Sequence, residues 1–256
     1  MEAELDTVKV EKDGKIATVT LNRPERLNAN SHEMARDLDA VSQLLDGDKE
    51  IRLVVIEGAG RAFSAGIDLK ELPKDNIDID MMPPWENGLR RFETMDALVI
   101  SLIHGYAIGG GLQIALASDI RVCTPDAELG LTAIEESILP GLGTWRLPRY
   151  IGLGRAMKMN TLGNYIDGEE ARRIGLVDHL VDEETRHEEL DGIIEDYMAG
   201  NSLGGRNTKH ATNAAFDHDY EAFMDLYMEL QRESMSSEDF DEAMAALRED
   251  RDPEWA

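Results

Sequence analysis

The chain has 256 residues, of which 52 are acidic and 26 are basic, giving a formal net charge of −26. This charge excludes most nucleic-acid-binding proteins, because a polyanion is held by a basic surface that displaces its counterions. No apolar run approaches the roughly 20 residues needed to cross a bilayer, and no basic segment leads into an apolar one at the N-terminus. The single cysteine, Cys123, excludes an intrachain disulfide and any metal site built from several cysteines. We therefore expect a cytoplasmic protein.

The acidic residues are spread along the whole sequence and do not gather in one binding patch. Such a surface repels itself at ordinary ionic strength, but at molar salt the Debye length shrinks to about 3 Å and screens the repulsion. The composition therefore predicts a protein from a high-salt cytoplasm. An ordinary acidic enzyme is the alternative.

The first expected elements are two strands, over 7–12 and 15–21, which alternate apolar and polar residues. They flank Asp13 and Gly14, a dipeptide that suits a tight hairpin turn. A helix is expected next, because Asn30 and Glu33 have the spacing of a capping box. Apolar residues then recur at helical spacing until 47, so this helix is amphipathic.

Two short apolar runs, over 51–57 and 98–103, are rich in β-branched residues and predict buried strands. A helix of small residues is expected over 111–118, and a further strand over 120–123. Because strands alternate with helices, the sequence predicts an α/β core with largely parallel strand pairing.

Beyond about residue 183 the strand signals stop, and the chain becomes helical and highly acidic. We therefore divide it into an α/β core over 1–182 and a helical C-terminal region over 183–256. Apolar residues at spacings of three and four in this region are typical of a helix face in a core or a subunit interface. They are Phe216, Tyr220, Phe223, Met224 and Tyr227. Prolines and aspartates predict a mobile loop over 72–85.

Two glycine-containing loops, over 61–71 and 104–120, follow the expected buried strands. Glycine lets another group approach the backbone closely, and a helix that begins there points free N–H groups outward. Each loop is thus able to offer amide donors to an anion. The run from Gly109 to Gly111 matches neither the dinucleotide fingerprint nor the phosphate-binding loop. A tight turn with close helix packing is the alternative.

The sequence resembles the crotonase superfamily, which includes enoyl-CoA hydratases and isomerases, over almost its whole length. The matching segments, in chain order, cover 21–29, 61–71, 104–120, 139–152, 168–181 and 236–255. The resemblance implies a spiral of ββα units and a helical C-terminal region that trimerises, often into a dimer of trimers. It also implies an acyl-CoA thioester as the partner, with coenzyme A as part of the substrate and no separate cofactor or metal. Neither nucleic acid nor membrane is implied.

The resemblance assigns the thioester carbonyl to two backbone N–H groups, those of Ile67 and Gly110. Reactions in this superfamily pass through an enolate-like oxyanion, and each donor aimed at such an oxygen is worth roughly 3 to 4 kcal/mol. The side chain at 67 is then free to vary, whereas any side chain at 110 is expected to obstruct the carbonyl.

The same resemblance places the adenine of coenzyme A against the backbone near Ala65 and Leu69. It places basic groups near the phosphates at Arg61 and Lys70, and Arg26 is a weaker candidate for this anionic region. Without the resemblance, exposed Arg and Lys side chains are expected to be solvated charges.

The sequence departs from the hydratases at both acid/base positions. Gln113 stands where they carry a glutamate after the glycine triplet, and Ala133 stands where they carry a second one. Hydration requires a base for water and an acid for the α-carbon, and a glutamine does not exchange protons at a useful pKa. Ordinary hydratase activity is therefore not expected.

Glu135 and Glu136 lie close to the second position. In a helical turn over 132–137, Glu136 projects from nearly the same face as Ala133, whereas Glu135 points elsewhere. Glu136 is therefore the candidate replacement, and a solvated surface acid is the alternative. His104 is expected to have a structural role, and Asp68 a capping role.

The sequence thus predicts an acyl-CoA enzyme of the hydratase/isomerase group that stabilises a thioester enolate with altered acid/base groups. One alternative is a decarboxylase or another reaction that needs only one proton donor. The other is a catalytically inactive paralogue that binds a CoA thioester.

Overall fold

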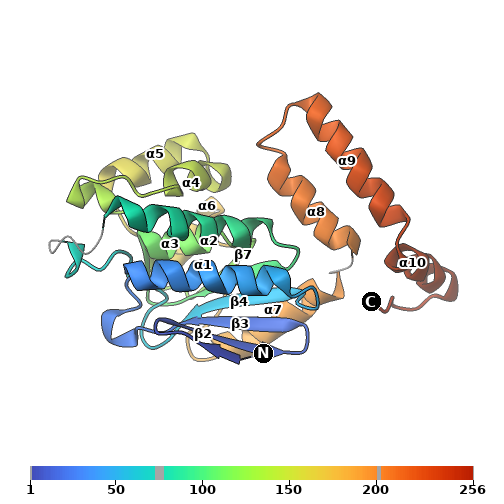
Figure 1. Cartoon of the computed structure of the whole chain (residues 1–256), viewed down its shortest axis with the longest axis horizontal. Helices are drawn as coiled ribbons and strands as arrows, with labels where there is room; N and C mark the ends of the chain where they lie inside the picture. Colours follow the sequence, from blue (N-terminus) through green and yellow to red (C-terminus); the bar gives the residue numbers. More distant parts are fainter. Residues whose placement is uncertain (1, 73–77, 201–202, 256) are drawn as a thin grey trace.

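The computed structural model describes residues 2–72, 78–200 and 203–255 (Figure 1). Its centre is a seven-stranded sheet with the order β1-β2-β3-β4-β5-β7-β10. The strands are β1 (Glu2–Glu4), β2 (Val8–Asp13), β3 (Ile16–Leu21), β4 (Leu53–Gly58), β5 (Leu98–Ile103), β7 (Ile120–Cys123) and β10 (His179–Leu180). A smaller sheet contains β6 (Tyr106–Ile108), β8 (Glu128–Gly130) and β9 (Ile166–Asp167).

The pairing of the large sheet confirms the predicted α/β class. Strands β2 and β3 form the expected antiparallel hairpin, and Gly14 takes a positive φ of 56° at its turn. From β3 to β10 every neighbouring pair is parallel. The four residues from Leu53 to Ile56 are all buried, as expected for a strand covered on both faces.

Helices cover both faces of the large sheet (Figure 1). The α-helices of the described residues are α1 (His32–Gly47), α2 (Met82–Thr94), α3 (Gly110–Leu116), α4 (Gly143–Ile151), α5 (Leu153–Leu162), α6 (Gly168–Ile174), α7 (Arg186–Ala199), α8 (Leu203–Ala214), α9 (Tyr220–Met235) and α10 (Glu238–Glu249). Helices α1 and α2 pack over the main core cluster, and Leu190 and Ile194 of α7 pack against the opposite face.

Two sequence predictions are wrong, one about the cap of α1 and one about the loop before α2. Ser31, not Asn30, caps α1, because its hydroxyl accepts a hydrogen bond from the Met34 N–H at 3.2 Å. Within the loop predicted over 72–85, residues 73–77 lie outside the described residues, but Ile79–Met81 form the 3-10 helix η3 and α2 begins at Met82. Trp85 in the first turn of α2 is only 2% exposed. Burial of this side chain therefore orders a segment for which the prolines had predicted irregular structure.

The last three helices, α8 to α10, project from the body of the molecule (Figure 1). Lys209 of α8 anchors them: its buried ammonium group pairs with Asp119 at 2.8 Å and donates to the Ala97 carbonyl at 2.6 Å. The predicted apolar stripe is largely open in the single chain, because Phe216 and Tyr220 are 67% and 71% exposed. These two side chains therefore do not lie in a core of this chain. Among the described residues, no helix is long and apolar enough to span a membrane.

Candidate active site

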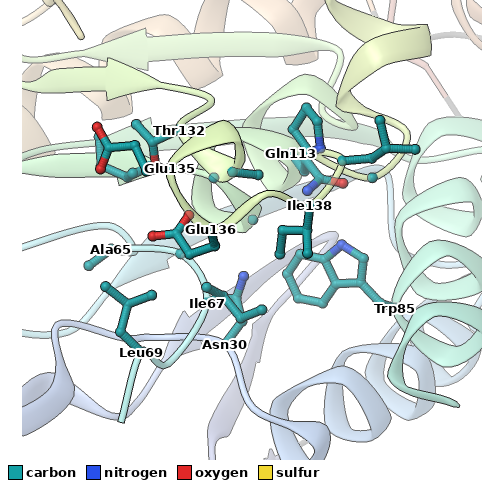
Figure 2. A pocket seen from close by; sticks show the side chains of 18 of the residues that line it. Asn30, Ala65, Ile67, Leu69, Trp85, Gln113, Thr132, Glu135, Glu136 and Ile138 are labelled. Atoms are coloured by element: carbon teal, nitrogen blue, oxygen red, sulfur yellow. The ribbon is translucent and has the colours of Figure 1, made fainter. Parts of the chain in front are cut away.

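One pocket collects nearly all the sequence-predicted catalytic groups (Figure 2). Its walls come from the loop after β4, the β6–α3 junction, the start of α2 and the segment 132–141. The predicted residues on its lining are Ala65, Ile67, Leu69, Gly110, Gln113, Ala133 and Glu136. Residues from four separate parts of the sequence thus meet at one site.

Backbone pairing turns the Ile67 N–H toward this pocket. On either side of it, the Asn30 N–H donates to the Gly66 carbonyl at 2.7 Å and the Asp68 N–H donates to the Asn30 carbonyl at 3.0 Å. This alternation leaves the Ile67 N–H without an acceptor among the described residues. The group is therefore available to a ligand.

The Gly110 N–H is the second available donor. Gly110 is the first residue of α3, where helix N–H groups have no intrahelical partner, and no acceptor for it lies within the described part of the chain. Gly66, with a φ of 82°, brings the two segments together, because a Cβ there would lie 2.5 Å from the Ile108 carbonyl oxygen. The two free donors thus belong to backbone segments in direct contact.

Asn30 was not predicted as a site residue, yet it lines the pocket and is only 2% exposed. A Cβ on Gly110 would lie 1.7 Å from the Asn30 Nδ2 and 3.1 Å from a ring carbon of Trp85. Any side chain at position 110 would therefore clash with Asn30 and Trp85. This adds a physical reason for Gly110 to the predicted need to admit a carbonyl.

Glu136 lies on η4 (Ala133–Glu136), a 3-10 helix in which residues three apart are nearly eclipsed. It therefore projects over the position of Ala133, as the sequence predicted. In Figure 2 its carboxylate lies on the side of Ala65, Ile67 and Leu69. Glu135 also lines the pocket, but it is exposed and lies beside Thr132 (Figure 2). Of the two acids, Glu136 is the more enclosed.

Gln113 approaches the pocket from the opposite side, next to Trp85 and Ile138 (Figure 2). It lies one turn beyond Gly110 on α3 and is 6% exposed. Its amide is therefore the most enclosed polar side chain on this wall, and it offers hydrogen bonds but no titratable proton.

Tyr165, across the pocket, is a lining residue that the sequence did not predict. Burial raises the pKa of its phenol, and the negative charge of Glu135 raises it further. The phenol therefore stays protonated at neutral pH. No motif marked this residue, because it reaches the pocket from the turn before β9.

His104 and Asp68 stand outside the lining, as expected for structural residues. The His104 Nε2 bonds to the Gly60 carbonyl oxygen at 3.0 Å, and burial lowers the pKa of its ring. Asp68 accepts from the Lys70 N–H at 3.1 Å and pairs with Arg23 at 3.2 Å. The predicted structural role of His104 is thus supported, and Asp68 caps a turn.

Three cations assigned to the coenzyme do not reach the lining. Arg61 and Lys70 are exposed, and Arg26 is half-buried in η1 (Pro24–Arg26). None of the three has a carboxylate partner among the described residues. Such cations are notable in a chain with twice as many acidic as basic residues, and they flank the loop that carries Ala65 and Leu69.

Comparison with known proteins gives a consistent result. Residues 11–256 match the family model described as enoyl-CoA hydratase/isomerase. A short-chain-enoyl-CoA hydratase of Clostridium acetobutylicum is 33% identical over 252 residues, which is 97% of each chain.

Solved structures extend this likeness to the fold. An enoyl-CoA hydratase from Bacillus anthracis superimposes with a TM-score of 0.90 at 28% identity, covering 98% of this chain and 99% of the other. A Thermobifida fusca YX protein in complex with acetoacetyl-CoA gives a TM-score of 0.83 at 26% identity, covering 90% and 95%.

Proposed function

The chain belongs to the enoyl-CoA hydratase/isomerase family, and we propose that its pocket binds an acyl-CoA thioester and stabilises the enolate formed from it. The observation that carries this proposal is the pair of unbonded N–H groups at Ile67 and Gly110, both on the pocket lining. Donors fixed in the backbone stabilise charge as it develops on the thioester oxygen without reorganising.

We propose that Glu136 moves the proton. In the isomerisation of a 3-enoyl thioester, its carboxylate removes a proton from C2, and the C–H electrons form the C2–C3 double bond through the enolate. The C3–C4 double bond opens as C4 takes the proton back from Glu136. One carboxylate serves both transfers, which suits a site in which Gln113 and Ala133 replace the usual pair.

Hydration is the less favoured reaction, because Gln113 is able to position a water but does not deprotonate it. A decarboxylation or another single-proton reaction also fits a site with one carboxylate. An inactive thioester-binding paralogue is the remaining alternative.

Three assays on the native protein separate these functions. We expect conversion of but-3-enoyl-CoA to but-2-enoyl-CoA, slow hydration of but-2-enoyl-CoA, and no loss of CO₂ from a malonyl thioester. Decarboxylation in place of isomerisation would favour the second reaction. Thioester binding without any turnover would favour the paralogue, and the absence of binding would contradict the whole proposal.

We propose that Arg61 and Lys70, with Arg26 beside them, attract the phosphates of coenzyme A. Unpaired cations next to Ala65 and Leu69 favour this placement. Lys70→Gln is then expected to weaken binding of an acyl-CoA more than binding of the same acyl group on pantetheine, which lacks the nucleotide. Equal weakening of both ligands would contradict the assignment.

We propose that the exposed stripe containing Phe216 and Tyr220 joins copies of this chain into a trimer or a dimer of trimers.

We also propose that this assembly is adapted to high salt, as the charge of −26 indicates. Lowering KCl from molar to about 0.1 M lengthens screening from about 3 to about 10 Å. The oligomer is expected to dissociate or unfold, as measured by light scattering and thermal melting. A flat melting temperature over this range would contradict salt adaptation.

A further inference from the structure

The Gln113 amide carries an unsatisfied atom: its Oε1 is buried and has no hydrogen-bond partner among the described residues. A buried acceptor without a donor costs about 1 to 3 kcal/mol. Because most buried polar side chains are satisfied, such an atom calls for an explanation from its surroundings.

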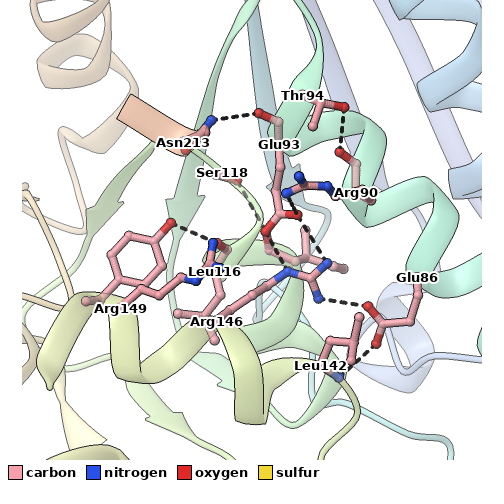
Figure 3. A network of polar contacts seen from close by, with 12 residues as sticks. Glu86, Arg90, Glu93, Thr94, Leu116, Ser118, Leu142, Arg146, Arg149 and Asn213 are labelled. Atoms are coloured by element: carbon pink, nitrogen blue, oxygen red, sulfur yellow. Dashed lines mark hydrogen bonds and ion pairs between the residues drawn. The ribbon is translucent and has the colours of Figure 1, made fainter. Parts of the chain in front are cut away.

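Those surroundings are dominated by Glu86 of α2. Its Oε2 accepts from an Arg146 guanidinium nitrogen at 2.8 Å, and its Oε1 accepts from the Leu142 N–H at 3.0 Å (Figure 3). Arg146 is 1% exposed and also bonds Glu93 at 2.7 Å. A carboxylate that accepts from a buried cation and from a backbone donor presents acceptor oxygens to any further neighbour.

Glu86 and Gln113 meet across Gly141. The position that a Cβ on Gly141 would take lies 2.6 Å from the Gln113 Oε1 and 2.9 Å from the Glu86 Oε1. Gly141 has a φ of 51°, so its own conformation also favours glycine. The ends of the Gln113 and Glu86 side chains thus both border Gly141.

Two acceptors facing one another repel, whereas an amide turned by 180° fills the same space and presents its NH2 group. We infer that Glu86 is a positioning residue that attracts the NH2 group of Gln113 and thereby directs the amide carbonyl oxygen into the pocket. This inference rests on the proposed function, because it assumes that the pocket receives the acyl group of a thioester.

The orientation defines a substrate preference. Ile67 and Gly110 supply donors for the thioester oxygen, and the Gln113 wall then supplies an acceptor near the acyl chain. An acyl group with a hydroxyl at C3 is able to donate to this acceptor, whereas a C3 keto group only accepts. We therefore expect the pocket to favour 3-hydroxyacyl over 3-oxoacyl thioesters.

The test measures dissociation constants of 3-hydroxybutanoyl-CoA and acetoacetyl-CoA. The native protein is expected to bind the hydroxy compound about tenfold more tightly, which corresponds to one hydrogen bond of about 1.4 kcal/mol. In Glu86→Gln the Gln113 amide loses its fixed partner, and the preference is expected to fall to about twofold or less. Glu93→Gln is the matched control, because it also removes a carboxylate from Arg146 but lies away from Gln113.

A second measurement needs no variant at Glu86. In native protein with labelled glutamine side chains, the Gln113 NH2 protons are expected to exchange at least about tenfold more slowly than those of exposed Gln231, because they face the buried side. Gln113→Met identifies the signal by removing it. Fast exchange would place the NH2 group in the open pocket and overturn the inference.

The outcomes separate the role of Glu86 from the proposed binding of a thioester. Tight binding of both thioesters without the preference, or equal loss of preference in Glu86→Gln and Glu93→Gln, overturns the role of Glu86 alone. If neither thioester binds the native protein, the proposed function fails, and the role of Glu86 fails with it.

Discussion

The two walls of the pocket are built in different ways. On one wall the proposed oxyanion donors are the backbone N–H groups of Ile67 and Gly110, fixed by strand pairing and by a helix start. On the other wall the polar groups are side chains, and both positions expected to carry glutamates hold Gln113 and Ala133. The backbone wall is fixed by the fold, whereas the other wall changes with single residues. The first should therefore hold the thioester carbonyl, and the second should determine which acyl groups bind and which proton moves.

The largest effect is expected from breaking the backbone wall with Gly110→Val. The new Cβ would lie 1.7 Å from the Asn30 Nδ2. Asn30 would have to move, which would disturb the Gly110 N–H beside it. Loss of one such donor costs about 10² to 10³ in rate, so we expect turnover to fall at least about 100-fold, with thioester binding lost. Steady-state kinetics and calorimetric titration measure the two effects.

The matched control is Gly192→Val in α7, where an added Cβ meets nothing within 4 Å. It should retain native kinetics. If Gly110→Val also keeps near-native turnover, the assignment of the oxyanion donors is wrong.

The second effect comes from a side chain of the pocket, Glu136. Glu136→Gln removes the proposed proton carrier and leaves both backbone donors intact, so we expect isomerisation to fall at least about 100-fold with little change in thioester affinity. Glu135→Gln, on the same 3-10 turn, is the control and should keep most activity. The reverse result would assign the proton transfer to Glu135.

A third variant restores glutamates at both replaced positions of the pocket. Gln113→Glu combined with Ala133→Glu supplies two carboxyl groups, and we expect hydration of but-2-enoyl-CoA to rise at least about 100-fold. The decrease in enoyl absorbance follows the reaction. A native protein that is already a fast hydratase would contradict our interpretation of both replaced positions.

The smallest effect concerns His104, whose buried ring bonds the Gly60 carbonyl oxygen outside the pocket. Burial lowers the pKa of its ring below the ordinary value of 6.5. The unfolded state therefore binds more protons just below pH 6.5, so this stabilisation is present above that pH and is lost as the pH falls. His104→Gln does not titrate. Between pH 7.5 and 5.5 the native melting temperature should drop more than that of the variant, and parallel curves would disprove this role.

Local sequence patterns predicted the scaffold well. Strands β4 and β5 are apolar runs, and the hairpin at Gly14 follows its turn residues, so chain-local rules suffice. The helix at Met82 was missed because Pro83 and Pro84 indicate irregular structure. They instead occupy the first turn of α2, where proline costs no hydrogen bond.

The site was only partly predictable. Ile67 and Gly110 lie in motifs of the family, so their proposed backbone roles come from the resemblance, and both N–H groups lack an acceptor among the described residues. No motif marked Asn30 or Glu86 as a site residue, because Asn30 reaches the pocket beside Gly110 and Glu86 lies near Gln113 at Gly141, which are far along the chain. Patterns of short range carry no signal for such contacts, so only the packed structure reveals them.

We propose that the backbone donors and one displaced carboxylate suffice to form an enolate. Deuterium incorporation at C2 of butanoyl-CoA in heavy water, followed by mass spectrometry, tests it without assuming any final product. We expect exchange by the native protein and by Glu135→Gln, and at least about 100-fold slower exchange by Glu136→Gln. Exchange by Glu136→Gln at the native rate would contradict this proposal.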